Sequence, residues 1–489
     1  MAGQFNTQTP APIAGALDDR LARGGPVIVV SQLVKAFVRF GSMVIMARLL
    51  SPHDYGVFGM AAVAYGFFQV GRDPGLTAMG VQRLTLEPKV ADALFWLLLG
   101  AGLLQAGLMM GTGVALARFY HEPQLTPLLA ALAGALILAN LGAQFRVHLL
   151  RALRYPIVAL IEVSALLGAT ALALIAASRA FGHWALVVLI FSQELLTTLG
   201  LVFAAHWRPG RWPGRAHARG LLDLAAGAAG AGYANYAILF YDQFFIGRWF
   251  GPAALGLYGR AGQLATLPGS VFFGPLTGWM MHALSRLRDH PDEFRAFYRR
   301  VVCGLMHACC PLAALLMAAP ESFLGWLLGP SWVPTAPLLR ALALGLFVLP
   351  FSFADVWVLM AMGASRRLLS WSMVKLAGLL LALIIARPGG LVAVAWTAAG
   401  AGLALNLASC AVIASVSPLR CGDFLTTTWR PVLLGAALGL ALTTALKLGT
   451  PPAAAICIGG VLYAAIVWLW PSARSGVGEL LALARTRRA

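Results

Sequence analysis

Residues 47–61 read ARLLSPHDYGVFGMA, and residues 247–261, which lie 200 positions later, read GRWFGPAALGLYGRA. In each copy an apolar run ends at the arginine, and proline and glycine follow at spacings typical of a turn. A turn repeated in this way between two apolar runs predicts two related halves of the chain. The identical residues that we take as structural signatures of the turns are Arg48, Pro52, Gly56, Arg248, Pro252 and Gly256.

The composition places these halves in a membrane. Of the 489 residues 60% are hydrophobic and only 11% are charged, and the mean hydropathy is +0.79. A soluble domain could not bury this much apolar surface. Apolar runs close to the ~20 residues that cross a bilayer recur along the whole chain. We therefore expect an all-α polytopic membrane protein of about 14 spans, with two six-helix lobes related by a pseudo-two-fold axis normal to the membrane and two further C-terminal helices.

The loops predict the orientation and the domain boundaries. Basic residues, Arg72 and Arg146 among them, concentrate in alternate loops, which is the pattern of cytoplasmic loops, and both termini fall on that side. The net charge of +18 then reports orientation and contact with anionic membrane lipids, with no nucleic acid as partner. The predicted parts are a cytoplasmic segment 1–25, an N-lobe 26–206, a linker 207–220, a C-lobe 221–414, spans 13 and 14 in 415–470 and a cytoplasmic tail 471–489.

Basic residues inside the spans are the first candidates for function, because a charge at the middle of a bilayer is costly and usually faces protein or a watery cavity. Lys35 and Arg39 lie four residues apart on one predicted helix face, where two cations suit a diphosphate or acidic sugars. The alternative is that each cation pairs with a carboxylate or reaches the membrane surface. Arg260 and Lys375 are the other predicted substrate-binding residues.

Acidic residues inside the spans are candidates for ion coupling. A carboxylate in a low dielectric can exchange protons during a transport cycle. The alternative for each acid is a static counter-ion to Lys35, Arg39 or Lys375. Asp242 is the preferred coupling residue because it lies beside the second signature turn. The full set is Asp242, Glu162, Glu194 and Asp355.

These turns carry a resemblance to a known family. The chain resembles the bacterial polysaccharide and lipid-linked oligosaccharide flippases, which are Wzx-like transporters of the multidrug/oligosaccharidyl-lipid/polysaccharide exporter superfamily. Pro74 departs from the family's usual pattern in the second cytoplasmic loop. The resemblance rests on residues 47–52, 54–56, 72–76 and 81–83 for the first signature, and on residues 242–243, 246–248, 251–258 and 260–261 for the second.

The resemblance implies a two-lobed flippase with a central cavity. It would move a polyprenyl-pyrophosphate-linked oligosaccharide from the cytoplasmic to the outer face of the bacterial inner membrane by alternating access, for exopolysaccharide, capsule or O-antigen export. A polysaccharide polymerase and the chain-length machinery are candidate partners. Two alternatives stay open at this point. One is a drug or cation antiporter of the same superfamily, and the other is a lipid-linked oligosaccharide polymerase or ligase.

No catalytic residue, cofactor or metal is predicted. The sequence contains no GxxxxGK[ST] phosphate-binding loop and no HExxH motif. The six cysteines contain no CxxC pair. Energy for transport must then come from an ion gradient, from removal of the substrate on the far side or from a separate subunit.

Overall fold

The computed structural model describes residues 11–72, 87–269, 273–451, 454 and 458–463. The segment that carries Pro74 and the predicted tail 471–489 lie outside these residues. Within them every regular element is helical. The chain forms two compact units, residues 1–236 and 237–489, and each is described by itself.

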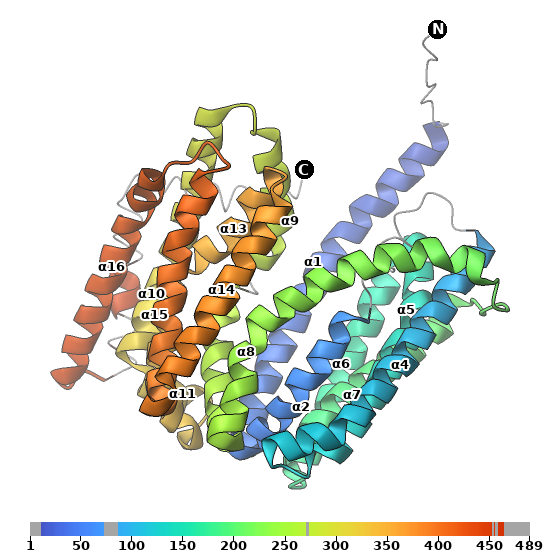
Figure 1. Ribbon diagram of the computed structural model, residues 1–489, viewed down its shortest axis with the longest axis horizontal. Helices are drawn as coiled ribbons and strands as arrows, with labels where there is room; N and C mark the ends of the chain where they lie inside the picture. The colour runs from blue at the N-terminus through green and yellow to red at the C-terminus, as the bar shows by residue number, and fades with distance from the viewer. Residues whose placement is uncertain (1–10, 73–86, 270–272, 452–453, 455–457, 464–489) are drawn as a thin grey trace. The chain divides into compact units, whose positions relative to one another are not determined.

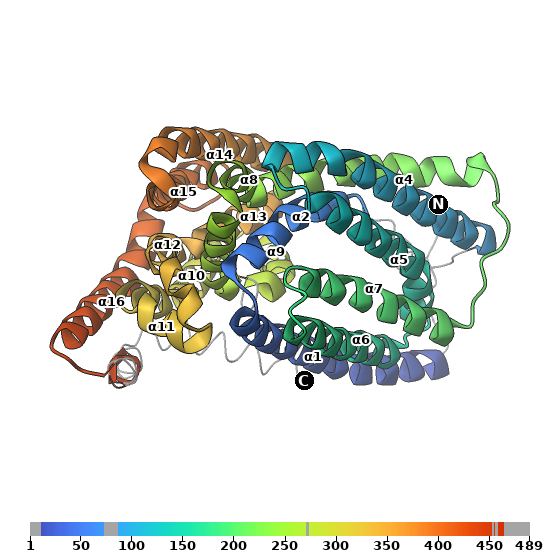
Figure 2. The same cartoon turned by 90° about the horizontal axis from the view of Figure 1, so that it is seen from below.

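The N-terminal unit is a helical bundle in which neighbours pack in the order α4, α5, α7, α6 and α1 (Figure 2), with α2 against α5. Helix α5 is its centre, because Leu128, Leu132 and Leu136 repeat at a spacing of four residues and are all fully buried. The helices are α1 (Ala11–Leu49), α2 (Pro52–Val70), α4 (Pro88–Tyr120), α5 (Leu125–Arg151), α6 (Tyr155–Ser178) and α7 (Trp184–Ala205).

The C-terminal unit has a core of large aromatic side chains. Phe273, Tyr298 and Trp357 are fully buried there, and α10 packs on α16, α14 on α15 and α9 on α13 (Figure 1). Its elements after α8 (Arg215–Pro268) are α9 (Gly274–Arg286), α10 (Pro291–Ala318), α11 (Pro320–Leu327), η2 (Pro330–Thr335), α12 (Ala336–Ala343), η3 (Leu344–Phe347), α13 (Leu349–Ala361), α14 (Ser365–Ala386), η4 (Arg387–Gly389), α15 (Gly390–Ala414) and α16 (Cys421–Lys447).

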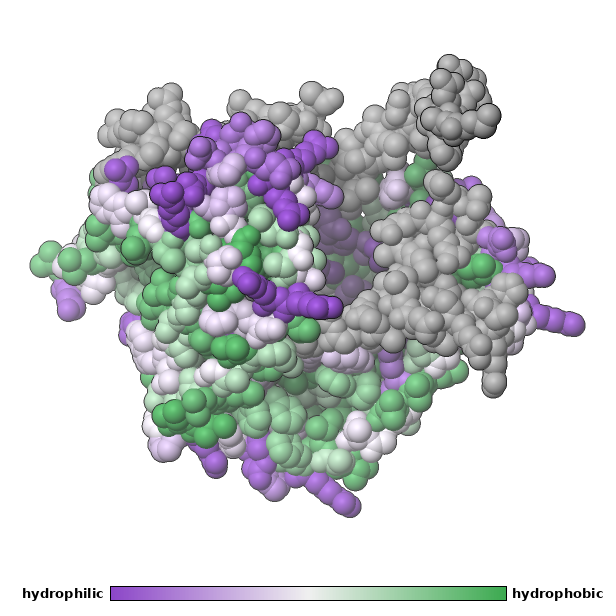
Figure 3. Space-filling view, turned by 45° about the horizontal axis from the view of Figure 1, so that its top comes forward, coloured by the Kyte–Doolittle hydropathy of each residue, from purple (hydrophilic) through white to green (hydrophobic). Residues whose placement is uncertain are grey.

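The outer faces of the helices are apolar, as a lipid environment requires. Phe203 of α7 is 75% exposed and Leu440 of α16 is 67% exposed. Figure 3 shows apolar side chains over wide parts of the surface and hydrophilic side chains gathered toward its margins. Eight helical segments of the described residues are long and apolar enough to cross a membrane, or nine if one bent pair counts as a span. The protein is therefore a multi-pass membrane protein, while the count of fourteen spans in two six-helix lobes stays a prediction.

Both signature turns separate two helices, for reasons that the local sequence supplies. In the first copy Ser51 caps α2, because its hydroxyl accepts from the Asp54 N–H at 3.2 Å while the Asp54 carboxylate accepts from the Ser51 N–H at 3.1 Å. Pro52 is the first residue of α2. In the second copy Gly251, with φ +83° and ψ 179°, breaks α8 just before Pro252. The repeated motif thus makes the same kind of helix junction twice.

The remaining signature residues lie around these junctions. Gly56 and Gly256 are both buried one turn into the helix that follows. Arg48 lies in the last turn of α1 and is exposed, whereas Arg248 is half-buried within α8. Two prolines and two buried glycines therefore share their structural places between the copies.

Helix α7 ends at Ala205 and α8 begins at Arg215, so residues 215–220 of the predicted linker 207–220 are helical. The division of the chain into two compact units falls between Tyr236 and Ala237, inside α8. At the N-terminus α1 begins at Ala11, so helix occupies part of the predicted segment 1–25. The domain boundaries stay a prediction.

Candidate functional site

The first charged cluster joins three helices of the N-terminal unit. Glu162 of α6 binds two cations, one on each carboxylate oxygen. Its Oε2 lies 2.6 Å from Lys35 Nζ of α1, and its Oε1 lies 2.7 Å from Arg146 Nη2 of α5. The Lys35 and Glu162 side chains are 9% and 16% exposed, whereas the Arg146 side chain is 46% exposed. The cluster carries one net positive charge and is open on the arginine side.

Arg39 lies one helical turn beyond Lys35 but in a different environment. Lys35 is buried and Arg39 is exposed. The predicted pair of stacked cations is therefore not the arrangement at Glu162, where the second cation is Arg146 of another helix. For Lys35 the structure agrees with the alternative interpretation, in which the cation pairs with a carboxylate. A substrate-binding role for Lys35 and Arg39 stays a prediction.

A second cluster in the same unit contains Arg72 and Glu194. Arg72, directly after α2, has Nη1 3.5 Å from Glu194 Oε1 of α7, and its Nη2 donates to the Ala139 carbonyl of α5 at 3.0 Å. Both side chains are mostly buried. The end of α2 is thereby tied to two neighbouring helices, and Glu194 has a cation partner.

The charged cluster of the C-terminal unit is more deeply buried. Lys375 of α14 donates to Asp355 Oδ2 of α13, and Ser409 of α15 donates to the same oxygen at 2.9 Å. Lys375 Nζ also lies 3.3 Å from Asn406 Oδ1, and Trp371 Nε1 donates to the Ser409 hydroxyl at 2.7 Å. Asp355 is only 2% exposed. Lys375 and Asp355 are thus a buried ion pair in a polar network across three helices.

Asp242 differs from the other three acids of the predicted set. Its Oδ2 accepts from the Tyr258 hydroxyl at 2.8 Å and its Oδ1 accepts from the Gln243 N–H at 2.7 Å. No cation lies within ion-pair distance of it among the described residues, whereas Glu162, Glu194 and Asp355 each have at least one. Asp242 and Tyr258 lie on opposite sides of the Gly251 break, so their hydrogen bond links the two parts of α8.

Arg260 is buried rather than open to a substrate. Its exposed fraction is 9%, it donates to the Gln263 side chain one turn ahead, and its guanidinium lies 5.9 Å from the ring centroid of the fully buried Trp332. This environment suits a packing role in the C-terminal unit. The predicted role in substrate binding stays untested.

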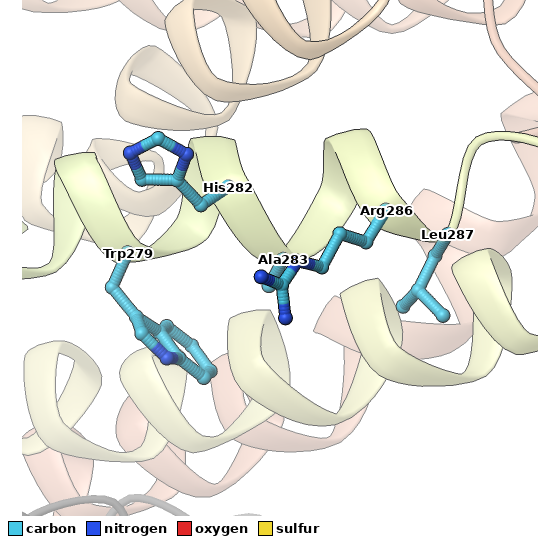
Figure 4. Close-up of a pocket in the computed structure, with 5 residues that line it drawn as sticks. All are labelled: Trp279, His282, Ala283, Arg286 and Leu287. Atoms are coloured by element: carbon cyan, nitrogen blue, oxygen red, sulfur yellow. The ribbon is translucent and has the colours of Figure 1, made fainter. Parts of the chain in front are cut away.

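The C-terminal unit also has a cavity of about 650 Å³ on α9. In Figure 4 the His282 and Trp279 side chains point to different sides of the helix, and Arg286 extends beside Ala283. None of the predicted substrate-binding or ion-coupling residues lines this cavity, which is formed by Trp279, His282, Ala283, Arg286 and Leu287.

The first signature turn also anchors the loop between α6 and α7. Asp54 Oδ1 accepts from the His183 N–H at 3.0 Å and lies 3.7 Å from His183 Nδ1. Burial lowers the pKa of the His183 imidazole, and the Asp54 carboxylate opposes this effect. His53 adds to the lowering and Glu122 opposes it. The turn between α1 and α2 is thus tied to the loop between α6 and α7.

Sequence reasoning missed Arg146 and Arg72 because both were assigned to loops. Helix α5 continues to Arg151, so Arg146 lies inside it. The sequence signal that could have identified these arginines is the presence of acidic residues inside the spans. Glu162 and Glu194 stand in apolar helices, and such acids need a cation or a proton, so basic residues at the neighbouring helix ends were candidates.

Comparison with known proteins defines the family. Residues 45–337, more than half of the chain, match the family described as polysaccharide biosynthesis protein. The chain belongs to this family. The succinoglycan biosynthesis transport protein ExoT of Rhizobium meliloti (strain 1021) is 26% identical over 473 residues, which cover 92% of this chain and 93% of the relative.

Solved structures show the same fold. The lipid II flippase MurJ in an inward closed conformation has a TM-score of 0.70 at 12% identity, covering 90% of this chain and 98% of its own. An inward-facing multidrug resistance MATE transporter of the MOP superfamily has a TM-score of 0.60 at 12% identity, covering 78% and 95%. The predicted family and the helical fold class are confirmed. The relative named above is a transport protein, and the two solved structures are a flippase and a transporter.

Proposed function

We propose that this member of the polysaccharide biosynthesis protein family flips a polyprenyl-pyrophosphate-linked oligosaccharide from the cytoplasmic to the outer face of the bacterial inner membrane by alternating access. The observation that carries the proposal is the family match over residues 45–337. Charged clusters inside apolar helices support it, because such charges in a transporter mark substrate or ion pathways. The exported sugar is a precursor of an exopolysaccharide, a capsule or an O-antigen. A polysaccharide polymerase and the chain-length machinery are the partner proteins of this proposal.

The sign of the buried charge favours an anionic substrate. Glu162 is shared by two cations, so its cluster retains a positive charge that an uncharged or cationic substrate would not use. Guanidinium and ammonium groups are the usual protein ligands of phosphate oxygens. The Glu162 cluster therefore suits the diphosphate of a lipid carrier better than the cargo of a drug or cation antiporter.

Asp242 is the coupling residue of this proposal. A static counter-ion needs a cation beside it, and three of the four acids have one, but Asp242 accepts only from neutral donors among the described residues. A carboxylate held by a hydroxyl and an amide can take up a proton without breaking an ion pair. Proton binding there would change the link across the Gly251 break.

The orientation is part of the proposal. Both termini are cytoplasmic, because the basic residues concentrate in the loops on the side of the termini. Cysteine labelling of single-cysteine variants at the two ends with a membrane-impermeant reagent tests this placement. Labelling of intact cells at either end would contradict it.

The decisive experiment is deletion of the gene. We expect a lipid-linked oligosaccharide to accumulate on the cytoplasmic face, and the polymer to disappear from the cell surface. Complementation with the wild-type chain should restore export, and Asp242→Asn should not. Arg340→Ala, which changes an exposed ion pair with Glu321, is the matched control and should restore export. Normal surface polymer without any accumulated lipid-linked sugar would refute the proposed function.

A further inference from the structure

We propose that Glu162 is an internal placeholder for the substrate's phosphoryl group, and that Arg146 and Lys35 are the two cations that this group binds when it displaces the carboxylate. This inference rests on the proposed function. It replaces the predicted pair of Lys35 and Arg39 by a pair of cations on different helices. It also assigns a function to Arg146, which the sequence alone placed in a loop.

The geometry at Glu162 is that of a bridged anion. One carboxylate oxygen is 2.6 Å from Lys35 Nζ and the other is 2.7 Å from Arg146 Nη2. A phosphoryl group also presents several oxygens on one atom, and it can bridge an ammonium and a guanidinium in the same way. The two cations are therefore already spaced for an anion that offers one oxygen to each.

The different exposure of the three side chains gives the order in which an arriving anion contacts them. Arg146 is 46% exposed, whereas the Lys35 and Glu162 side chains are 9% and 16% exposed. An arriving anion meets Arg146 first and reaches Lys35 only after the carboxylate has moved. In the absence of substrate Glu162 neutralises Lys35, which would otherwise be an unpaired cation in an apolar bundle at considerable cost.

The three residues also come from three helices. Lys35 lies on α1, Arg146 on α5 and Glu162 on α6, and α1 and α5 each pack against α6. Exchange of the carboxylate for a phosphoryl group would remove the only anion that ties α6 to both cations of this cluster among the described residues. Substrate binding would thereby change the connections among these helices within the N-terminal unit.

The test measures anion binding to the purified full-length chain. Inorganic pyrophosphate is titrated by calorimetry at constant ionic strength into the wild type, Glu162→Gln and Arg146→Ala. Removing the competing negative charge should tighten binding about tenfold in Glu162→Gln, because a like charge beside a bound anion opposes it. Arg146→Ala should weaken binding by about the same factor, because it removes the exposed donor of a charge-assisted contact.

The matched control is Glu321→Gln, which also removes one carboxylate from an arginine but in an exposed pair. It should leave the affinity unchanged. An equal gain in this control would show a general charge effect and would overturn the inference, as would an unchanged or weaker affinity in folded Glu162→Gln. If Glu162→Gln does not fold, Arg146→Ala alone decides, and wild-type affinity in that variant overturns the inference.

A second comparison separates the sources of the phosphoryl group. Geranyl diphosphate should show the same gain in Glu162→Gln as pyrophosphate does. Vesicles of phosphatidylglycerol should show none, and an equal gain with them would make the site a lipid headgroup site and overturn the assignment to substrate. If Glu162→Gln shows no gain while the deletion strain accumulates the lipid-linked sugar, the inference fails and the proposed function stands. If Glu162→Gln binds the diphosphate more tightly but the deletion strain accumulates no lipid-linked sugar, the anion site stands and the proposed flippase function is refuted.

Discussion

Replacement of Lys375 by methionine should strongly destabilise the C-terminal unit. The Asp355 side chain is 3% exposed, and without Lys375 the Ser409 hydroxyl at 2.9 Å is the donor that remains to its Oδ2. Breaking a buried ion pair by removal of one partner costs about 3–5 kcal/mol, because the other charge is left uncompensated. The double variant Asp355→Asn with Lys375→Met has no buried charge and should recover most of this loss.

The assay is equilibrium unfolding of the purified chain in mixed micelles with increasing sodium dodecyl sulfate. Arg340→Met is the matched control, because the Arg340 and Glu321 side chains are 39% and 50% exposed. Its loss of stability should be about 1 kcal/mol or less, as for exposed pairs in general. Lys375→Met unfolding at the same detergent fraction as this control would refute the description of Lys375 and Asp355 as a buried pair.

Three further results are expected. Gly251→Ala should cost about 1–3 kcal/mol in the same unfolding assay, because only glycine adopts its φ of +83° and ψ of 179° without strain, whereas Gly259→Ala, in open helical surroundings, should cost little. Asp242→Asn should abolish the dependence of transport in proteoliposomes on an imposed pH gradient, and a preserved dependence would contradict its coupling role. The lowered pKa of His183 means that the unfolded chain binds its proton more readily, so wild-type stability should fall as the pH drops below about 6.5. Melting temperatures of His183→Gln should show a smaller fall over that range, and an identical fall would exclude His183 as the cause.

The helix junctions were predictable because they depend on local chemistry. Proline at the start of a helix and glycine at a positive φ act on their own backbone, so Pro52 and Gly251 need no knowledge of the tertiary structure. The helical class followed equally from composition, since only helices and closed barrels satisfy their backbone groups in lipid.

The partners of the buried charges were not predictable in the same way. Lys35 and Glu162 lie 127 positions apart in the sequence, and several acids inside the spans were equally good candidates for the lysine. The choice of partner depends on which helices pack together and on how each is rotated about its axis. For α1, α5 and α6 this is known only from the three-dimensional structure. Arg146 was missed because it lies close in sequence to Arg151 and Arg154, and three neighbouring basic residues are typical of a cytoplasmic loop, whereas α5 continues to Arg151.

Helix α8 has a practical consequence for work with parts of this chain. Tyr236 donates to the Val63 carbonyl of α2 at 2.7 Å, and the Tyr233 ring lies 4.7 Å from that of Phe67. Any side chain larger than hydrogen at Gly66 would collide with Tyr236. If the chain is divided within residues 207–214 and the two fragments are coexpressed, Tyr233 and Tyr236 belong to the second fragment. Their contacts on α2 belong to the first fragment. Such a split should favour spontaneous reassembly of the two polypeptides.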